Sequence, residues 1–361
     1  MDKEIDVVSL FSGIGGFEEG LRLANIKNRI VFASEIDLFA QISYKSNFSG
    51  AFLHGDITKI DENEIPSHQL LVAGFPCQAF SIAGKQQGFE DTRGTLFFDV
   101  ARILNKKRPK YIVLENVKNL ISHNNSKTII KILETLNEIG YVVDFTVINS
   151  YEAGVPQNRD RTYICGILNG VSEKFVYDKR SVKANKLKEE LNKTDFSGFN
   201  FFNKVNFNDE QKYIEDIIED NVDSKFFLNS DSVREFLKSN SEVKDVKNER
   251  KIIKLFDLPR EVHNDLERQR RIYSIKGISP TVLARSDSTK ILINENGNLK
   301  IRKITPTENF FIQGFDKHFV ENIKNTGMSA TQMYKQSGNA VSPPVIAGIL
   351  RQLNEEYIIN D

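Results

Sequence analysis

The sequence has few cysteines, no net charge and no long apolar run, and each absence excludes a class of protein. Two cysteines in 361 residues cannot form a disulfide framework, so we expect a protein of the reducing cytoplasm. No apolar run approaches the ~20 residues that span a bilayer, and we expect no membrane segment. The opening MDKEIDVV is typical of an acidic start to a strand rather than of a signal peptide. A balance of 49 Lys and Arg against 49 Asp and Glu argues mildly against a nucleic-acid-binding protein, which is usually basic.

The charge is unevenly distributed along the chain. Residues 1–100 hold 8 Lys and Arg against 14 Asp and Glu, a net −6, whereas residues 241–310 hold 15 against 10, a net +5. The basic segments Glu267–Lys276 and Lys300–Lys303 suit contact with phosphate, although a charge run can also be an ordinary solvated face. The zero balance is therefore an average over an acidic part and a locally basic part.

The first 170 residues alternate short apolar segments with amphipathic ones. The expected strands are Asp6–Phe11, Ile30–Glu35, Leu70–Gly74, Tyr111–Glu115, Val142–Ile148 and Thr162–Leu168. The expected helices are Phe17–Ala24, Leu38–Asn47, Thr95–Asn105 and Lys127–Ile139. Strand–helix alternation at this spacing predicts an α/β fold with a doubly wound, mostly parallel sheet. Ligands in such sheets bind at the carboxyl ends of the strands.

The composition changes near Asp178, which predicts a second, smaller and irregular β-rich domain. Lys, Asn, Asp and Glu are frequent after this point, and interleaved Phe side chains favour a folded module over disorder. Beyond it we expect strands over Thr281–Ala284 and Lys290–Asn294 and helices over Ala330–Gln336 and Val345–Tyr357. The predicted division is a large domain of residues 1–178 and 326–361, a small domain of residues 179–304 and a hinge of residues 305–325.

A glycine-rich turn follows the first predicted strand. Gly13, Gly15 and Gly16 allow a tight turn and a close approach of the backbone to a ligand. Glu35 ends the next strand about 20 residues on, where a carboxylate can accept from ribose hydroxyls, and Asp56 could contact an adenine edge. A βα turn without a ligand, or a nicotinamide-dependent oxidoreductase, would show the same turn.

Five further residues belong to segments that end at the same predicted sheet edge. Pro76 and Cys77 follow the buried strand LLVAG, which places a cysteine on a loop at the ligand edge. Glu115 ends the strand YIVLE and is a candidate acid for hydrogen bonding to a substrate. Arg159 and Arg161, two apart on an extended stretch, would point to one face and could hold an anion or a carboxylate. Taken singly, Cys77 is better explained as a small buried side chain and the arginine pair as a solvated surface pair, and Glu115 fits a helix cap or surface group equally well.

The motifs together resemble the DNA cytosine-C5 methyltransferase family. They occur in order along essentially the whole chain: LFSGIGG, ASEID, GDI, GFPCQAFS, ENV, QNRDR, RIYSIKGISPT, RKITPTENFFIQGF and GNAVSPP. The resemblance implies a Rossmann-like methyltransferase sheet, with target recognition by residues 179–304. It leaves the oxidoreductase without support, because that reading explains neither GFPCQ nor ENV nor the arginine pair.

The resemblance also implies a mechanism. Cys77, as a thiolate, would attack C6 of a cytosine flipped out of the duplex, and Glu115 would bind N3 and the exocyclic amine. Arg161 is expected to contact the base, and Arg159 to support the site and nearby backbone. The methyl donor would be S-adenosyl-L-methionine, with S-adenosyl-L-homocysteine as product and no metal.

Further roles carry over to matching positions. The resemblance implies cofactor contacts by Phe11, Gly13, Ile14, Gly16, Glu35, Ile36, Asp56, Ile57, Pro76, Leu96, Asn339 and Val341. It implies DNA contacts by Gln78, Ser81, Arg93 and Arg271. Ser9, Ile36 and Ala340 depart from the family pattern, in which Asp, an aromatic residue and Ser are frequent, and the other cysteine, Cys165, reads as core.

The expected partner is double-stranded DNA. We expect a monomer in the bacterial cytoplasm, associated with the nucleoid, and a companion restriction endonuclease could act on the same site without touching this protein. An RNA cytosine-C5 methyltransferase and a catalytically silent DNA-binding relative are the alternatives. The long insert, Gln78 and the intact Cys77 and Glu115 favour an active DNA enzyme. The recognised DNA sequence is not legible in residues 179–304.

Overall fold

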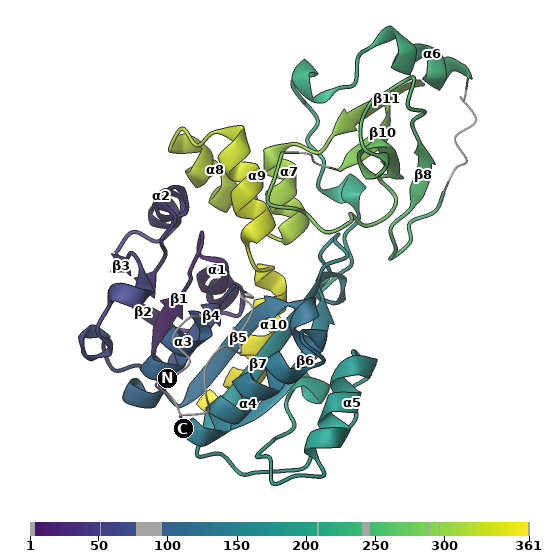
Figure 1. Cartoon of the computed structure of the whole chain (residues 1–361). Coiled ribbons are helices and arrows are strands. Elements are labelled where there is room, and N and C mark those ends of the chain that lie inside the picture. The colour runs from purple at the N-terminus through teal and green to yellow at the C-terminus, as the bar shows by residue number, and fades with distance from the viewer. Residues whose placement is uncertain are drawn as a thin grey trace. The chain divides into compact units, whose positions relative to one another are not determined.

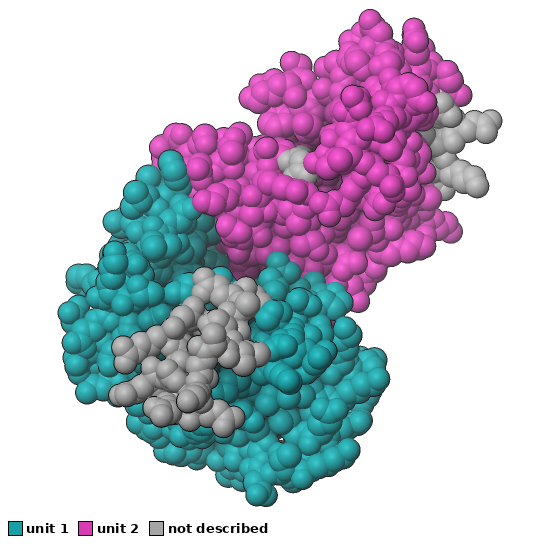
Figure 2. Space-filling view, in the orientation of Figure 1, with its two compact units in different colours: residues 1–148, 160–206, 345–361 teal, residues 149–159, 207–344 magenta. Residues whose placement is uncertain are grey.

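The structure is a computed structural model that describes residues 4–50, 52–76, 96–207, 209–239, 246–286, 289–295 and 297–359. Its contacts divide the chain into two compact units, which Figure 2 colours separately. Unit 1 comprises Met1–Ile148, Asp160–Asn206 and Val345–Asp361, and unit 2 comprises Asn149–Arg159 and Phe207–Pro344. The two units are groups of residues that contact one another, and they do not show which residues share a function. The functional domains expected from the sequence therefore stay a prediction.

A seven-stranded sheet in the order β3-β2-β1-β4-β5-β7-β6 forms the centre of unit 1 (Figure 1). Its strands are β1 (Ile5–Leu10), β2 (Asn28–Ser34), β3 (Leu53–His54), β4 (Leu70–Gly74), β5 (Tyr111–Val117), β6 (Tyr141–Asn149) and β7 (Asp160–Leu168). β3, β2, β1, β4 and β5 pair in parallel, whereas β7 pairs with β5 in antiparallel orientation. The sheet is therefore mixed but mostly parallel.

Helices pack on both faces of this sheet. They are α1 (Gly16–Leu23), α2 (Leu38–Asn47), α3 (Leu96–Lys107), α4 (Lys127–Ile139), α5 (Val182–Leu191) and α10 (Pro343–Leu353). Figure 1 shows α4 on one face of the sheet and α10 on the other. One apolar cluster joins side chains of β1, β4, β5 and β6 with those of α3, α4 and α5, so the core lies between the sheet and these helices.

The strand order reverses between β1 and β4. The chain runs outward from β1 through β2 to β3, and then returns to begin β4 on the other side of β1. Such a switch point opens a crevice at the carboxyl ends of the two central strands. The glycine-rich turn follows β1, and Pro76 follows β4, so both lead from this edge.

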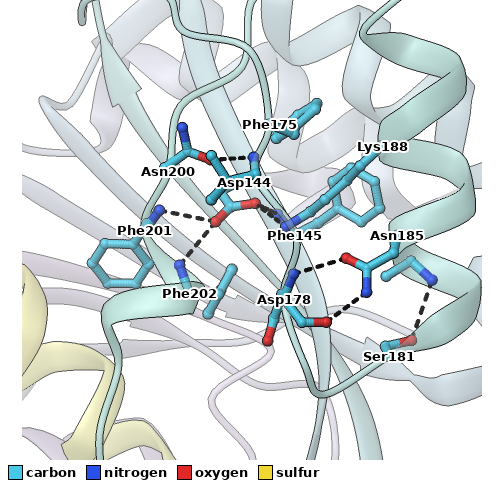
Figure 3. A network of polar contacts seen from close by, with 12 residues as sticks. Asp144, Phe145, Phe175, Asp178, Ser181, Asn185, Lys188, Asn200, Phe201 and Phe202 are labelled. Atoms are coloured by element: carbon cyan, nitrogen blue, oxygen red, sulfur yellow. Dashed lines mark hydrogen bonds and ion pairs between the residues drawn. The ribbon is translucent and has the colours of Figure 1, made fainter.

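Within unit 1, a buried ion pair fastens residues 171–206 to the seven-stranded sheet (Figure 3). Lys188 of α5 contacts Asp144 of β6 at 2.6 Å, and both side chains are almost completely buried. The second carboxylate oxygen of Asp144 accepts from the backbone amides of Phe201 and Phe202 at 3.0 and 2.8 Å. The Lys188 ammonium also lies over the Phe175 ring. The Asp144 carboxylate therefore binds both α5 and the loop at residues 201–202, in a region whose sequence has no clear hydrophobic period.

Unit 2 contains a four-stranded sheet in the order β11-β10-β9-β8. The strands are β8 (Lys254–Asp257), β9 (Arg271–Ser274), β10 (Lys290–Glu295) and β11 (Asn298–Lys303). The helices of this unit are α6 (Asp231–Ser239), α7 (Pro306–Gln313), α8 (Lys317–Asn325) and α9 (Ala330–Asn339). Two small apolar clusters stabilise the unit, one of them between β10 and α7.

The predicted fold class is confirmed, both in the mostly parallel sheet and in the smaller β-containing second part. The strand expected over Thr281–Ala284 is wrong. Val282 pairs with no strand, because its amide donates to Gln157 Oε1 at 2.9 Å and its carbonyl accepts from Arg159 at 3.2 Å. The side chains of Gln157 and Arg159 thus take the place of the backbone partners that a neighbouring strand would supply. Within the described ranges, no helix is long and apolar enough to cross a membrane.

Candidate active site

The backbone of the glycine-rich turn after β1 would allow a ligand to approach it closely. Gly13 and Gly15 have φ of 56° and 96°, and Phe11 also has a positive φ of 54°, a region that residues other than glycine rarely occupy. A Cβ placed on Gly13 would meet no atom within 4 Å. The turn therefore has an open flank at Gly13, while Ile14 and Gly16 are buried beneath it.

The Glu35 carboxylate, one residue after β2, holds this turn. Its Oε2 accepts from the amide of Gly13 at 2.9 Å, and its Oε1 accepts from the amide of Asp37 at 2.7 Å. Burial raises the pKa of Glu35 above its usual value, and the two amide hydrogen bonds oppose that shift. The structure thus brings together two predicted residues, Gly13 and Glu35, that are 22 positions apart.

The other predicted cofactor residues of unit 1 differ in exposure. Ile36 is 68% exposed, whereas Ile57 is buried in the core. Asp56 caps the turn that Ile57 begins, and its Oδ1 accepts from the Thr58 hydroxyl at 2.7 Å. This hydrogen bond is the main cause that lowers the Asp56 pKa. Ser9, where the family pattern often has Asp, is fully buried.

Glu115 and Arg161 form an ion pair at the carboxyl end of β5. Arg161 Nε lies 3.1 Å from Glu115 Oε1, and both side chains are largely buried. The antiparallel register explains the contact, since Glu115 is opposite Tyr163 and Val117 is opposite Arg161, which brings the two side chains together diagonally on one face. A carboxylate held in this way keeps a fixed direction at the ligand edge of the sheet.

Asn116 ties this acid to the segment that leads to Cys77. Its side-chain amide donates to the carbonyl of Phe75 at 2.9 Å, and Gly74 is opposite Glu115 in the parallel register of β4 and β5. Sequence reasoning missed Asn116, although it lies within the ENV motif. Cys77, Gln78, Ser81 and Arg93 lie outside the described residues, and Pro76 and Leu96 flank that gap.

The Arg159 side chain binds backbone carbonyls of unit 2. Its guanidinium is buried and donates to the carbonyls of Val282, Gly338 and Ala340 at 3.2, 2.9 and 2.9 Å. These bonds hold the GNAV segment against residues 282–284, where a Cβ on Gly338 would come within 2.3 Å of Ala284 N. Arg161 thus contacts the Glu115 carboxylate, and Arg159 holds together two backbone segments of unit 2.

A buried amide pair that sequence reasoning missed reinforces this arrangement. Gln157 Nε2 donates to Gln313 Oε1 at 2.6 Å, and Gln313 Nε2 donates to the carbonyls of Ser337 and Ala340 at 2.7 and 3.1 Å. Both glutamines lie in motifs quoted above, QNRDR and FFIQGF. Of the two predicted cofactor residues in GNAV, Asn339 is exposed and Val341 is buried.

We expect Arg159→Lys to lower the stability of the protein by about 2 kcal/mol or more, because one ammonium cannot donate to three buried carbonyls in the same directions. Urea unfolding measures this loss. Unchanged stability combined with a lower kcat would instead indicate that Arg159 acts on the substrate.

The fold is an α/β sheet with charged side chains and a glycine-rich turn at the carboxyl edge of its strands, and comparisons with known proteins give the family. The family model described as C-5 cytosine-specific DNA methylase matches residues 5–355. The type II methyltransferase M1.ScrFI of Lactococcus lactis subsp. cremoris is 39% identical, over 97% of this chain and 78% of the relative. The type II methyltransferase M.SsoII of Shigella sonnei is 38% identical, over 96% of this chain and 79% of the relative.

Solved structures show the same fold. A mutant of DNMT2 from Spodoptera frugiperda matches with a TM-score of 0.66 at 22% identity, covering 96% of this chain and 99% of that one. The chain therefore belongs to the C-5 cytosine-specific DNA methylase family, and it is a DNA cytosine methyltransferase. The resemblance seen in the motifs is confirmed.

Proposed function

We propose that this enzyme transfers a methyl group from S-adenosylmethionine to C5 of a cytosine flipped out of a short, specific duplex sequence. The observation that carries the proposal is the Glu115–Arg161 pair at the carboxyl end of β5. A fixed carboxylate at this edge suits the polar edge of a cytosine ring, and β4 ends opposite it, three residues before Cys77. Flipping is required because a ring atom is inaccessible within the base stack.

In the proposed reaction Cys77 is the nucleophile. Its thiolate adds to C6, which forms a carbon–sulfur bond and moves electron density to C5. Glu115 holds N3 and the exocyclic amine, and Arg161 orients Glu115 and contacts the base. When bound, S-adenosylmethionine supplies an electrophilic methyl group for C5 and leaves as S-adenosylhomocysteine. The C5 proton is then lost, the carbon–sulfur bond breaks, and the Cys77 thiolate is released from 5-methylcytosine.

The residues present fit a nucleoside methyl donor. Each oxygen of the Glu35 carboxylate has one backbone amide partner and retains capacity to accept from a ribose hydroxyl. The Gly13 turn offers an open flank for close approach of the donor, and the exposed Ile36 offers an apolar surface for its base. Phe11, Asp56, Ile57, Pro76, Leu96, Asn339 and Val341 remain proposed members of this site.

We place the DNA contacts in the proposed recognition part, residues 179–304, and on Gln78, Ser81 and Arg93. Support comes from a cavity of about 420 Å³ in unit 2. The basic residues that line it are Lys254, Arg268, Arg271, Arg285 and Lys290. Such a lining suits phosphate oxygens. The enzyme would act as a monomer in the bacterial cytoplasm, with residues 305–325 as a hinge, and a companion endonuclease would read the same sequence independently.

Arg271→Ala is expected to weaken DNA binding at low salt by several-fold and to reduce the slope of log K against log[salt] by about 1, because one phosphate contact is lost. Arg29→Ala is a matched control, since Arg29 is an exposed arginine of β2, outside residues 179–304, whose ion-pair partner is Asp6. Fluorescence anisotropy with a labelled duplex measures both. Equal salt slopes for Arg271→Ala and the wild type would remove Arg271 from the DNA contacts.

Methylation-sensitive sequencing of DNA from cells that express the protein tests the proposed function. We expect 5-methylcytosine at one position of a single short motif, and none in cells expressing Cys77→Ser. Absence of 5-methylcytosine from the DNA would contradict the proposal. Its appearance in the RNA fraction alone would support the RNA-methylating alternative.

A further inference from the structure

A buried carboxyl group lies beneath the glycine-rich turn and has no role in the reaction described above. Glu18 is in the first turn of α1, where a charged side chain would ordinarily face water, yet it is only 4% exposed. The Tyr44 hydroxyl of α2 donates to Glu18 Oε1 at 2.9 Å. Burial raises the pKa of Tyr44, so this hydroxyl keeps its proton and remains a donor. The contact joins the helices that follow β1 and β2.

Phe48, the C-cap residue of α2, contacts the glycine-rich turn itself, four residues beyond Tyr44. The Phe48 ring packs so closely on Gly15 that a Cβ on the glycine would lie 2.1 Å from Phe48 Cε2. The Tyr44 and Phe48 rings are themselves 5.0 Å apart. The C-terminal end of α2 is therefore joined to α1 by the Tyr44–Glu18 hydrogen bond and to the glycine-rich turn by the Phe48 ring.

The N-terminal part of α2 holds the acid of the same site. The amide of Asp37, which caps the helix, donates to Glu35 Oε1 at 2.7 Å, and Gln41 Nε2 donates to the carbonyl of Glu35 at 2.6 Å. Glu35 Oε2 in turn accepts from Gly13 at 2.9 Å. The glycine-rich turn is thus bonded to Glu35, and Glu35 is bonded to the N-terminal end of α2. The C-terminal end of α2 in turn contacts α1 through Tyr44 and the glycine-rich turn through Phe48.

The chemistry of Glu18 suits a neutral group. Its Oε2 and the Ser9 hydroxyl are both buried, and neither atom has a hydrogen-bond partner within the described ranges. Burial raises the pKa of Glu18, and the Ser9 hydroxyl is close enough to oppose that shift. A protonated carboxyl can accept from Tyr44 with one oxygen and donate to Ser9 with the other. Glutamine has the same donor and acceptor in the same shape.

We propose that Glu18 and Tyr44 are positioning residues for the methyl-donor site. Their hydrogen bond keeps α2 docked on α1, the helix that begins at the glycine-rich turn, so that Gly13 and Glu35 have their binding geometry before the donor arrives. Preorganisation of this kind acts on affinity, because the ordering cost is met on folding rather than on binding. This inference rests on the proposed function, since it assumes that Gly13 and Glu35 bind the donor.

The test compares two tyrosine variants of the full-length enzyme. Tyr44→Phe removes the bond to Glu18, and we expect the Kd for S-adenosylhomocysteine and the KM for S-adenosylmethionine to rise by about tenfold, with kcat at saturating donor unchanged. Tyr141→Phe is the matched control. The Tyr141 hydroxyl is also buried and donates to the Pro109 carbonyl at 2.6 Å, but it belongs to β6 at the other end of the sheet from β2 and β3. A comparable loss of thermal stability without a change in donor affinity is expected there.

Two substitutions of Glu18 test whether a neutral hydrogen-bonding side chain can replace the carboxyl group. Glu18→Gln should keep the donor Kd within about twofold of the wild type, whereas Glu18→Leu should match or exceed the loss in Tyr44→Phe. Equal donor affinity in Tyr44→Phe, Tyr141→Phe and the wild type would overturn the inference and leave the contact with a role in stability alone. If the wild type itself did not bind S-adenosylhomocysteine in calorimetry, the proposed donor would be wrong, which is a separate outcome.

Discussion

The Cys77→Ser variant is expected to lose methyl transfer by a factor on the order of 10⁴ or more while still binding the methyl donor. A serine hydroxyl stays protonated at neutral pH and is a weak nucleophile without an adjacent base, so addition to C6 would not occur. Tritium transfer from labelled S-adenosylmethionine to a duplex measures the rate, and calorimetry with S-adenosylhomocysteine measures donor binding. Methylation that survives in Cys77→Ser would show that the nucleophile is misassigned.

Cys165 provides the matched control for this experiment. It is fully buried on β7, opposite Val113 of β5, and burial raises the pKa of its thiol well above the usual value. A neutral thiol without access to substrate is unreactive. Cys165→Ala should therefore retain methyl transfer, with only a small loss of stability from the missing sulfur atom.

A duplex with fluorine at C5 of the target cytosine would separate the covalent step from the rest of the reaction. Fluorine cannot leave as a proton does, so elimination of Cys77 is blocked after the methyl group has been transferred. The wild type and Cys165→Ala should form a protein–DNA adduct that survives denaturing electrophoresis, and Cys77→Ser should form none. An adduct in Cys77→Ser would contradict the proposed mechanism.

Asp144→Ala is expected to lower the stability of the protein by about 3–5 kcal/mol. The substitution leaves the Lys188 ammonium buried without its carboxylate, and it removes the acceptor for the amides of Phe201 and Phe202. Figure 3 shows how these groups converge on the one carboxylate. Urea unfolding followed by circular dichroism measures the loss.

Two variants test the cause of this effect. The double variant Asp144→Ala with Lys188→Met should recover part of the stability, since no uncompensated charge remains in the interior. Asp6→Asn, which breaks an exposed ion pair with Arg29, should cost less than about 1 kcal/mol. A similar small cost for Asp144→Ala would show that the buried pair does not organise residues 171–206.

Local pattern accounts for the elements that were predicted well. β4, α2 and α4 have the bounds expected from the sequence, because an uninterrupted apolar run specifies a buried strand and a 3.6-residue period specifies a helix face. The family could also be predicted from the sequence, because each of its motifs consists of contiguous residues. The second sheet was only partly predicted, since β8 and β9 have four residues each and depend on partners distant in sequence.

What the sequence by itself determined was the strand–helix alternation, the family and the residues that carry its motifs. Only the tertiary structure decided which partner each polar group has. Two neighbouring glutamates of α1 look alike in sequence, yet Glu19 pairs with Arg22 and Glu18 is buried against Tyr44. Arg159 and Arg161 look like a pair, yet Arg159 binds carbonyls more than 120 positions away. The physical reason is that burial removes water as a partner, so each buried polar group needs whatever donor or acceptor the fold brings beside it.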